Sequence, residues 1–147
     1  MIEYREATIL DLPVLVSLDR EYFPDTAWPA EQFRAELSGK TRKFLIAESE
    51  GQVIGYASAY LPTVGGDCDL MTIAVAPEFR RRGIAKHFIS ELEGWAKDRN
   101  ADSMMLEVDV KNESAISLYS SLGYEKLNIR KNYYGYGKDA QIMKRAL

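Results

Sequence analysis

The chain has 147 residues, of which 46% are hydrophobic and 28% charged, and its formal net charge is −3. This size predicts a single domain, residues 1–147, with a sizeable core. The only cysteine, Cys68, excludes an internal disulfide, and the only histidine, His87, excludes a Cys/His zinc cluster, so we expect no metal. No basic, apolar leader opens the chain and no apolar run reaches the ~18 residues of a membrane span, which predicts a cytoplasmic protein without a membrane partner.

The first half of the chain predicts a strand, two helices and three further strands. Residues 2–7 alternate apolar and polar side chains, as a half-buried strand does. A helical pattern follows. Thr8 and Asp11 resemble a capping box at its N-terminus, and Pro24 ends the helix. The later elements of this half are a short helix in residues 28–39 and strands in residues 43–48, 52–60 and 68–75.

The second half alternates helix and strand before it ends in two strands. An apolar stripe along residues 84–96 predicts an amphipathic helix, and residues 102–110 return to a period of two. Asn112 caps a predicted helix that stops at Gly123, and residues 124–147 read as two strands joined by a glycine-containing loop. The order β-α-α-β-β-β-α-β-α-β-β predicts a mixed α/β fold, with parallel strands brought together by the β-α-β-α segment.

The segment "FRRRGIAKHF", residues 79–88, carries four Arg or Lys side chains in an acidic protein. By itself it fits a solvated charge run, a nucleic-acid patch or a socket for a small anion. Its place between a strand and an amphipathic helix favours the socket, because the free N–H groups of a first helical turn bind phosphate. Gly83 allows a close approach and Ala85 keeps the next position small, while Arg81 and Arg82 add charge-assisted hydrogen bonds.

Two other readings of this segment are weaker. The basic residues are not gathered on one face with interleaved aromatics, so we expect no direct nucleic-acid binding. Neither GxxxxGK[ST] nor GxGxxG occurs in the chain, which removes the P-loop and the dinucleotide fingerprint. A small cofactor that carries a pyrophosphate fits the segment best.

Three motifs resemble one enzyme family. "RRRGIA", residues 80–85, is similar to the [QR]-x-x-G-x-[GA] signature of the Gcn5-related N-acetyltransferases (GNAT), and it follows the strand "MTIAVAP", residues 71–77. "LEVDVKNESAISLYSSLGY", residues 106–124, and "RKNYYGYGKDAQIM", residues 130–143, resemble the ribosomal-protein-alanine (RimI-type) and archaeal amino-terminal acetyltransferases. The similarity covers essentially the whole chain and is strongest from Leu70 to Met143. It implies a central mixed, mostly antiparallel twisted sheet with helices on both faces, and acetyl-CoA as the acetyl donor without a metal.

The resemblance assigns two catalytic residues. It makes Glu107 the general base, although strand spacing alone would favour a solvated glutamate. It makes Tyr119 the general acid that protonates the leaving CoA thiolate, although Tyr119 also continues the apolar helical stripe of Ala115, Leu118 and Leu122. A tyrosine can serve both purposes, with its ring in the core and its hydroxyl at the site.

The resemblance also implies the donor-binding residues. Backbone groups of the strand before the arginines would lie along the pantetheine arm, and the N–H of Val75 would polarise the thioester carbonyl. The helix start would bind the pyrophosphate, with Asn112 nearby. The implied acetyl-CoA residues are Ile73, Ala74, Val75, Arg81, Arg82, Gly83, Ile84, Ala85, Lys86 and Asn112.

On the acceptor side, aromatic residues gather in two predicted loop regions. Adjacent Tyr133 and Tyr134 in a polar loop cannot both face one core, whereas packing is the better reading for Phe23 and Trp28. Asp109 departs from the "LEVR" that is common in the bacterial relatives, and an acid beside the base would attract a substrate ammonium. The expected acceptor-binding residues are Tyr22, Asp109, Tyr133 and Tyr134.

The resemblance therefore predicts an enzyme that acetylates the N-terminal α-amino group of a protein or peptide by direct attack on the thioester. An α-amine, with a pKa of about 8, is easier to deprotonate than a lysine amine at about 10.4. The alternatives are acetylation of a small-molecule or lysine amine, and a noncatalytic acyl-CoA-binding module. We assign no chemistry to Cys68 or His87, and we expect a monomer or a weak homodimer.

Overall fold

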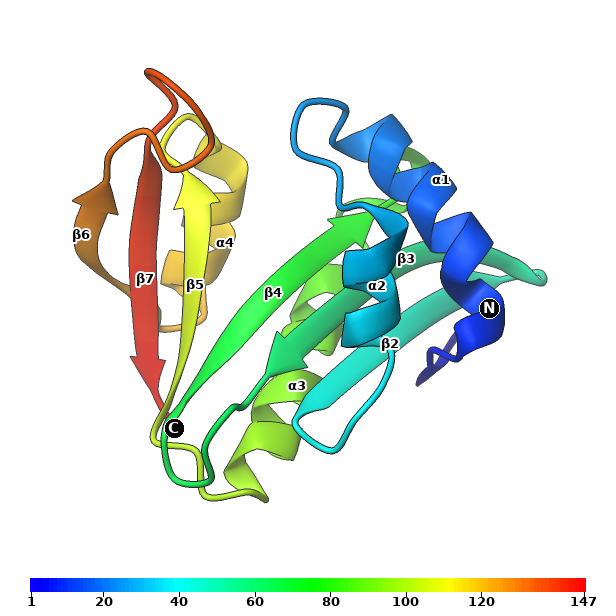
Figure 1. Cartoon of the computed structure of the whole chain (residues 1–147), viewed down its shortest axis with the longest axis horizontal. Coiled ribbons are helices and arrows are strands. Elements are labelled where there is room, and N and C mark those ends of the chain that lie inside the picture. The colour runs from blue at the N-terminus through cyan, green and yellow to red at the C-terminus, as the bar shows by residue number, and fades with distance from the viewer.

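Seven strands form one twisted sheet in the order β1-β2-β3-β4-β5-β7-β6 (Figure 1). The computed structural model describes residues 1–147. The strands are β1 (Ile2–Glu6), β2 (Arg42–Ser49), β3 (Gln52–Tyr60), β4 (Asp67–Val75), β5 (Ser103–Asp109), β6 (Glu125–Arg130) and β7 (Ala140–Ala146). The helices are α1 (Leu12–Tyr22), α2 (Ala30–Glu36), α3 (Ile84–Lys97) and α4 (Glu113–Ser121), with 3₁₀ turns at Ile9–Asp11 and Pro77–Phe79. The predicted order of helices and strands is confirmed.

The seam between β4 and β5 is the only parallel one in the sheet, and it is short. All other neighbouring strands pair antiparallel. β4 and β5 pair only from Asp67 with Ser103 to Asp69 with Met105. Beyond that point the two strands diverge and leave a widening gap (Figure 1). The mixed, mostly antiparallel sheet and its parallel pair are as predicted, but the early end of the pairing is not visible in the sequence.

A β-bulge lies where β4 leaves β5. On β3, consecutive residues Ser58 and Ala59 stand opposite Thr72 and Leu70, so Met71 is an extra residue on β4. A bulge of this kind bends its strand and increases the local twist. Because it lies two residues after Asp69, the last β5 partner, it turns β4 away from β5 and opens the centre of the sheet.

Helices cover both faces of the sheet, as predicted. On one face, α1 and α2 pack through Leu15 and Phe33 against β2 and β3, and both side chains are fully buried. On the other face, the predicted stripe of α3 packs into a larger core that also holds residues of β5 and α4. Full burial of one such aliphatic or aromatic side chain contributes about 1.5–3 kcal/mol. The stripe residues Ile84, Phe88, Leu92, Trp95 and Ala96 are all buried.

Local signals in the sequence fix several element ends. Thr8 and Asp11 form the predicted capping box, in which the Thr8 hydroxyl accepts from the Leu10 N–H and the Asp11 carboxylate accepts from the Thr8 N–H. The β2–β3 hairpin turns through Glu50 and Gly51, both with positive φ, as a two-residue turn requires. None of the helices combines the length and apolar character needed to cross a membrane.

Candidate active site

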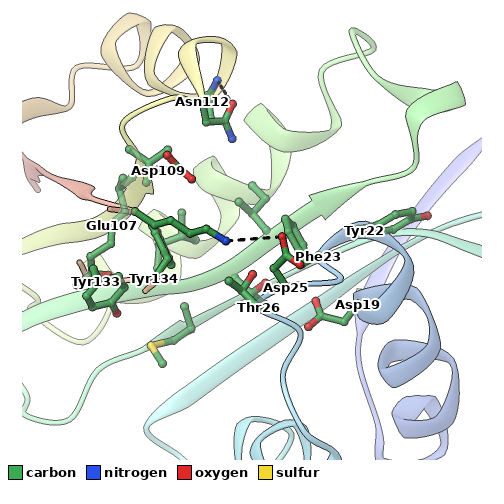
Figure 2. A pocket seen from close by; sticks show the side chains of 18 of the residues that line it. Asp19, Tyr22, Phe23, Asp25, Thr26, Glu107, Asp109, Asn112, Tyr133 and Tyr134 are labelled. Atoms are coloured by element: carbon green, nitrogen blue, oxygen red, sulfur yellow. Dashed lines mark hydrogen bonds and ion pairs between the residues drawn. The ribbon is translucent and has the colours of Figure 1, made fainter. Parts of the chain in front are cut away.

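A cleft of about 1090 Å³ occupies the region where β4 and β5 diverge. Figure 2 shows Glu107, Tyr133 and Tyr134 on one side of this cleft, with Phe23 and Asp25 of the α1–α2 loop facing them. Eight of the residues predicted from the sequence line it: Tyr22, Ile73, Glu107, Asp109, Asn112, Tyr119, Tyr133 and Tyr134. The structure thus brings the predicted catalytic and acceptor residues together, although they come from well-separated parts of the chain.

Glu107 lies on β5 with its side chain half-buried at the cleft. Its carboxylate forms no ion pair and accepts no hydrogen bond from another residue. Burial raises the pKa of Glu107 above its ordinary value and the Asp69 carboxylate raises it further, while Arg130 opposes the shift. A carboxylate in this setting accepts a proton more readily than a solvated one, which is what a general base needs.

Tyr119 belongs both to the core and to the cleft. Its ring is 6% exposed and packs edge-to-face on Tyr124 with the ring centroids 6.0 Å apart. Burial raises the pKa of the Tyr119 hydroxyl to about 12, so the hydroxyl keeps its proton at neutral pH. The two readings of Tyr119 from the sequence, core aromatic and site residue, therefore do not exclude each other.

The turn from β5 into α4 is held by two side chains that also line the cleft. Asp109 accepts a hydrogen bond from the Lys111 N–H at 2.9 Å, and Asn112 caps α4 by accepting from the Ala115 N–H at 3.2 Å. Sequence reasoning predicted the cap of Asn112 but not the turn-forming role of Asp109. The hydrogen bond from the Lys111 N–H holds the Asp109 carboxylate at the cleft.

The wall on the α1 side is anchored by a residue that sequence reasoning did not assign to the site. Asp19 is 3% exposed, and it accepts hydrogen bonds from the Tyr56 hydroxyl at 2.6 Å and the Trp28 N–H at 2.8 Å. These bonds tie α1 and the following loop to β3. The sequence did contain one indication, because Asp19 lies on the apolar stripe of a predicted helix, and a buried acid needs hydrogen-bond partners.

The β6–β7 loop forms the opposite wall. Tyr133 and Tyr134 pack edge-to-face with their ring centroids 4.9 Å apart, and the Arg130 guanidinium lies 4.8 Å from the centroid of the Tyr133 ring. From the same loop, the Lys138 ammonium reaches the Asp25 carboxylate of the α1–α2 loop at 3.9 Å, the ion pair drawn as a dashed line in Figure 2. Sequence reasoning missed Asp25 and Lys138, because nothing local relates two loops that are so far apart in the chain.

The start of α3 presents unpaired amide groups. Gly83 adopts a left-handed conformation with φ of 81°, and the first helical hydrogen bond runs from the His87 N–H to the Gly83 carbonyl at 2.9 Å. The N–H groups of Gly83, Ile84, Ala85 and Lys86 therefore have no acceptor in the protein. With the partial positive charge of the helix end, they form an anion-binding set that fits a pyrophosphate.

The side chains around this helix start divide into two kinds. Arg81, Arg82 and Lys86 are exposed, and the Arg82 guanidinium lies 4.9 Å from the Phe79 ring centroid. Ile84 is 2% exposed, so its side chain is a core residue and only its backbone is open to an anion. The predicted socket is thus mainly a backbone feature, with exposed cations beside it.

The strand before the arginines lies only partly on the cleft. Ile73 lines it, whereas Ala74 is buried under α1 and α2 and Val75 is half-buried. The Val75 carbonyl accepts a hydrogen bond from the Arg80 Nε at 3.2 Å. Arg80, which sequence reasoning left unassigned, links the loop before α3 to the end of β4.

The lone cysteine and histidine lie outside the cleft. Cys68 is fully buried, and burial raises the pKa of its thiol to about 12, so its side chain packs in the core and keeps its proton at neutral pH. His87 is exposed, and it stacks on Tyr4 with the ring centroids 3.6 Å apart. No group of three or more His, Cys, Asp or Glu side chains is arranged to hold a metal ion.

The sheet opens between two parallel strands, a carboxylate and a tyrosine lie in the opening, and free amides lie at the start of the next helix; this arrangement fits an enzyme that transfers an acyl group from a donor that carries phosphates. A sequence model of the acetyltransferase (GNAT) family matches residues 12–124. The chain belongs to this family.

Individual relatives agree with the family assignment. The chain is 33% identical to the N-alpha-acetyltransferase RimI of Mycobacterium tuberculosis over 82% of its own length and 77% of that protein. It is also 33% identical to an uncharacterized Mycobacterium leprae protein, where the match covers 94% of this chain but only 39% of the relative. The crystal structure of the ribosomal-protein-S18-alanine N-acetyltransferase from Escherichia coli superposes with a TM-score of 0.87 at 25% identity, covering 99% of this chain and 94% of that one.

Proposed function

We propose that the protein transfers the acetyl group of acetyl-CoA to the N-terminal α-amino group of a protein or peptide. The observation that carries this proposal is the placement of Glu107 and Tyr119 in one cleft, at the divergence of β4 and β5. The choice of acceptor is supported by two relatives, an N-alpha-acetyltransferase of Mycobacterium tuberculosis and a ribosomal-protein-alanine N-acetyltransferase of Escherichia coli. A cytoplasmic location and a monomeric or weakly dimeric state stay predictions.

The donor would be held mainly by backbone groups. The free amides from Gly83 to Lys86 would bind the pyrophosphate, and Arg81 and Arg82 would add charge at its edge. Backbone groups of Ile73, Ala74 and Val75 would lie along the pantetheine arm, with the Val75 N–H directed at the thioester carbonyl. The Asn112 amide nitrogen, which is left free because the Asn112 oxygen caps α4, would donate to the same arm.

The reaction follows from the proton affinities of the two catalytic side chains. Glu107 takes a proton from the acceptor ammonium, and the neutral nitrogen attacks the thioester carbonyl carbon. The carbon–sulfur bond breaks, the sulfur leaves as a thiolate, and Tyr119 donates its hydroxyl proton to it. The proton that the nitrogen loses on forming the amide restores the phenol, and Glu107 returns its own proton to water.

The acceptor would enter between the two loop walls. The aromatic rings of Tyr22, Tyr133 and Tyr134 would contact its first residues, and the Asp109 carboxylate would attract the ammonium. An α-ammonium, with a pKa of about 8, gives up its proton to a carboxylate far more easily than a lysine ammonium at about 10.4. This difference favours an N-terminal acceptor.

The test is a panel of acceptors with the acetylated nitrogen located by mass spectrometry. The panel contains peptides with varied first residues and one internal lysine, N-terminally blocked versions of the same peptides, and polyamines. We expect acetylation of the α-nitrogen only, and none of the blocked peptides. Acetylation confined to polyamines or to the internal lysine would overturn the proposed acceptor, and acetyl-CoA binding without any transfer would overturn catalysis.

A further inference from the structure

Asp69 is a carboxylate with no partner on the strand next to Glu107. It is half-buried on β4, and it forms no ion pair and accepts no hydrogen bond. Asp69 stands opposite Met105 in the last pair of the parallel seam. Because side chains alternate along a strand, Glu107, two residues after Met105, lies on the same face of the sheet as Met105. Near the end of the parallel pairing, two carboxylates on adjacent strands, Asp69 and Glu107, therefore both lack an ion-pair or hydrogen-bond partner.

Asp67, the next carboxylate along β4, differs from Asp69 in its contacts. It accepts a hydrogen bond from the Ser103 hydroxyl and pairs with the Lys144 ammonium at 3.7 Å. Its charge is thus largely balanced where it stands. Of the two neighbouring aspartates, only Asp69 raises the pKa of Glu107, and burial together with Asp67 raises the pKa of Asp69 itself.

The charge around Glu107 is mostly negative. The only cation that bears on it is Arg130 of β6, whose guanidinium is exposed and lies over the Tyr133 ring. An exposed guanidinium is screened by water more than the half-buried carboxylates are. The ionisable groups that act on Glu107 or line the cleft beside it are Asp69 from β4, Asp109 from β5, Lys111 from the turn before α4, Tyr119 from α4, Arg130 from β6, and Tyr133, Tyr134 and Lys138 from the β6–β7 loop.

We propose that Asp69 is a positioning residue for Glu107, and that its unbalanced negative charge makes Glu107 hold a proton, or a cationic amine, more tightly. Two like charges on adjacent strands repel, and either a proton on Glu107 or an ammonium bound to Glu107 relieves that repulsion. Asp69 does not line the cleft, so it acts through Glu107 and not by touching the acceptor. The inference rests on the proposed function, since it requires that Glu107 is the base.

The experiment compares the pH dependence of kcat/KM for one α-amino peptide between the wild type and Asp69→Asn, from about pH 5 to 9. Asp69 raises the pKa of Glu107, so its neutralisation lowers that pKa and Glu107 ionises at lower pH. In Asp69→Asn we expect the acid limb of the kcat/KM profile to move to lower pH by about 0.5–1 unit. The plateau value of kcat/KM should fall about 2- to 5-fold because the base is weaker. The amine of the peptide titrates identically in every assay, so a difference between variants reports the enzyme.

Three further variants complete the test. Asp69→Glu restores the charge and is expected to return the acid limb toward its wild-type position, while Asp67→Asn, the matched control, leaves the limb in place. Asp69→Ser replaces Asp69→Asn if that variant does not fold, as judged by circular dichroism, and shifts the limb in the same direction. An unmoved limb in both neutral variants, or an equal shift in Asp67→Asn, would overturn the role of Asp69. A wild-type rate in Glu107→Gln would instead overturn the proposed role of Glu107 as the base, on which the inference rests.

Discussion

The start of α3 presents its binding groups from one short segment, whereas the cleft between β4 and β5 gathers side chains from α1, β4, β5, α4 and two loops. At α3 the groups are mostly backbone amides, whose positions follow from the turn at Gly83. In the cleft the groups are side chains, and each has its own burial and neighbours. The arrangement at the helix start therefore depends little on the identity of side chains, whereas a change of one residue can alter the surface of the cleft.

This difference predicts different kinetic effects for the two regions. A change at the start of α3 should weaken donor binding and leave the chemistry in the cleft intact. A change of a catalytic side chain in the cleft should slow turnover and leave donor binding intact. The three variants below test this separation, in order of decreasing effect.

Glu107→Gln should have the largest effect. The amide keeps the shape of the side chain but cannot accept the proton, so kcat should fall by roughly 10²–10⁴-fold. Steady-state assays with both substrates saturating measure this loss. Glu113→Gln, at an exposed position in the first turn of α4, is the matched control and should stay close to the wild-type rate. A rate for Glu107→Gln equal to that of the control would remove Glu107 from the mechanism.

Gly83→Ala should have an intermediate effect on the donor side. A Cβ at Gly83 would meet no atom within 4 Å, but the left-handed φ of 81° costs a residue other than glycine about 1–2 kcal/mol. We expect the KM for acetyl-CoA to rise about 5- to 10-fold, with kcat nearly unchanged, because distortion of the turn moves the amides that we propose as the pyrophosphate-binding groups. Initial rates against acetyl-CoA concentration measure both constants.

Gly94→Ala is the control for this variant. Gly94 lies within α3 without a positive φ, and a Cβ there would also meet no atom within 4 Å. The alanine should stabilise the helix by about 0.5–1 kcal/mol without a change in the KM for acetyl-CoA. If Gly83→Ala lowered kcat and left the KM for acetyl-CoA unchanged, the start of α3 would take part in catalysis, and donor binding and catalysis would not be separate.

Lys138→Ala should have the smallest effect. Its ion pair with Asp25 joins the two loops that bound the cleft, but both side chains are largely exposed, and exposed pairs contribute little. We expect a rise of about 2- to 3-fold in the KM for the acceptor peptide, which disappears at high ionic strength. Lys131→Ala, on the same loop without an ion pair, should show no such rise. A salt-independent change would show that the ion pair is not its cause.

The features that depend on residues close together in the chain could be predicted from the sequence. The capping box of Thr8, the cap of Asn112 and the glycine before α3 are local, and each is present as predicted. The period of two predicted for residues 102–110 is present around Glu107, where Met104, Leu106 and Val108 are buried and Glu107 lies on the other face.

The features that depend on register and on contacts across the fold were not predictable. The cleft exists because the β4–β5 pairing stops at Asp69 and a bulge follows at Met71, and neither appears in a pattern of apolar residues. The nearness of Asp69 to Glu107 likewise depends on how two strands align. The role of Asp109 in the turn between β5 and α4 depends on one hydrogen bond, which its side chain accepts from the Lys111 N–H and which several other residue types could have formed.

The separation of donor binding from catalysis is tested most directly by calorimetric titration of acetyl-CoA into Glu107→Gln. We predict a dissociation constant within about twofold of the wild-type value, alongside the loss of turnover. A dissociation constant that rises in proportion to the loss of turnover would contradict the assignment of Glu107 to catalysis and place it in the donor site.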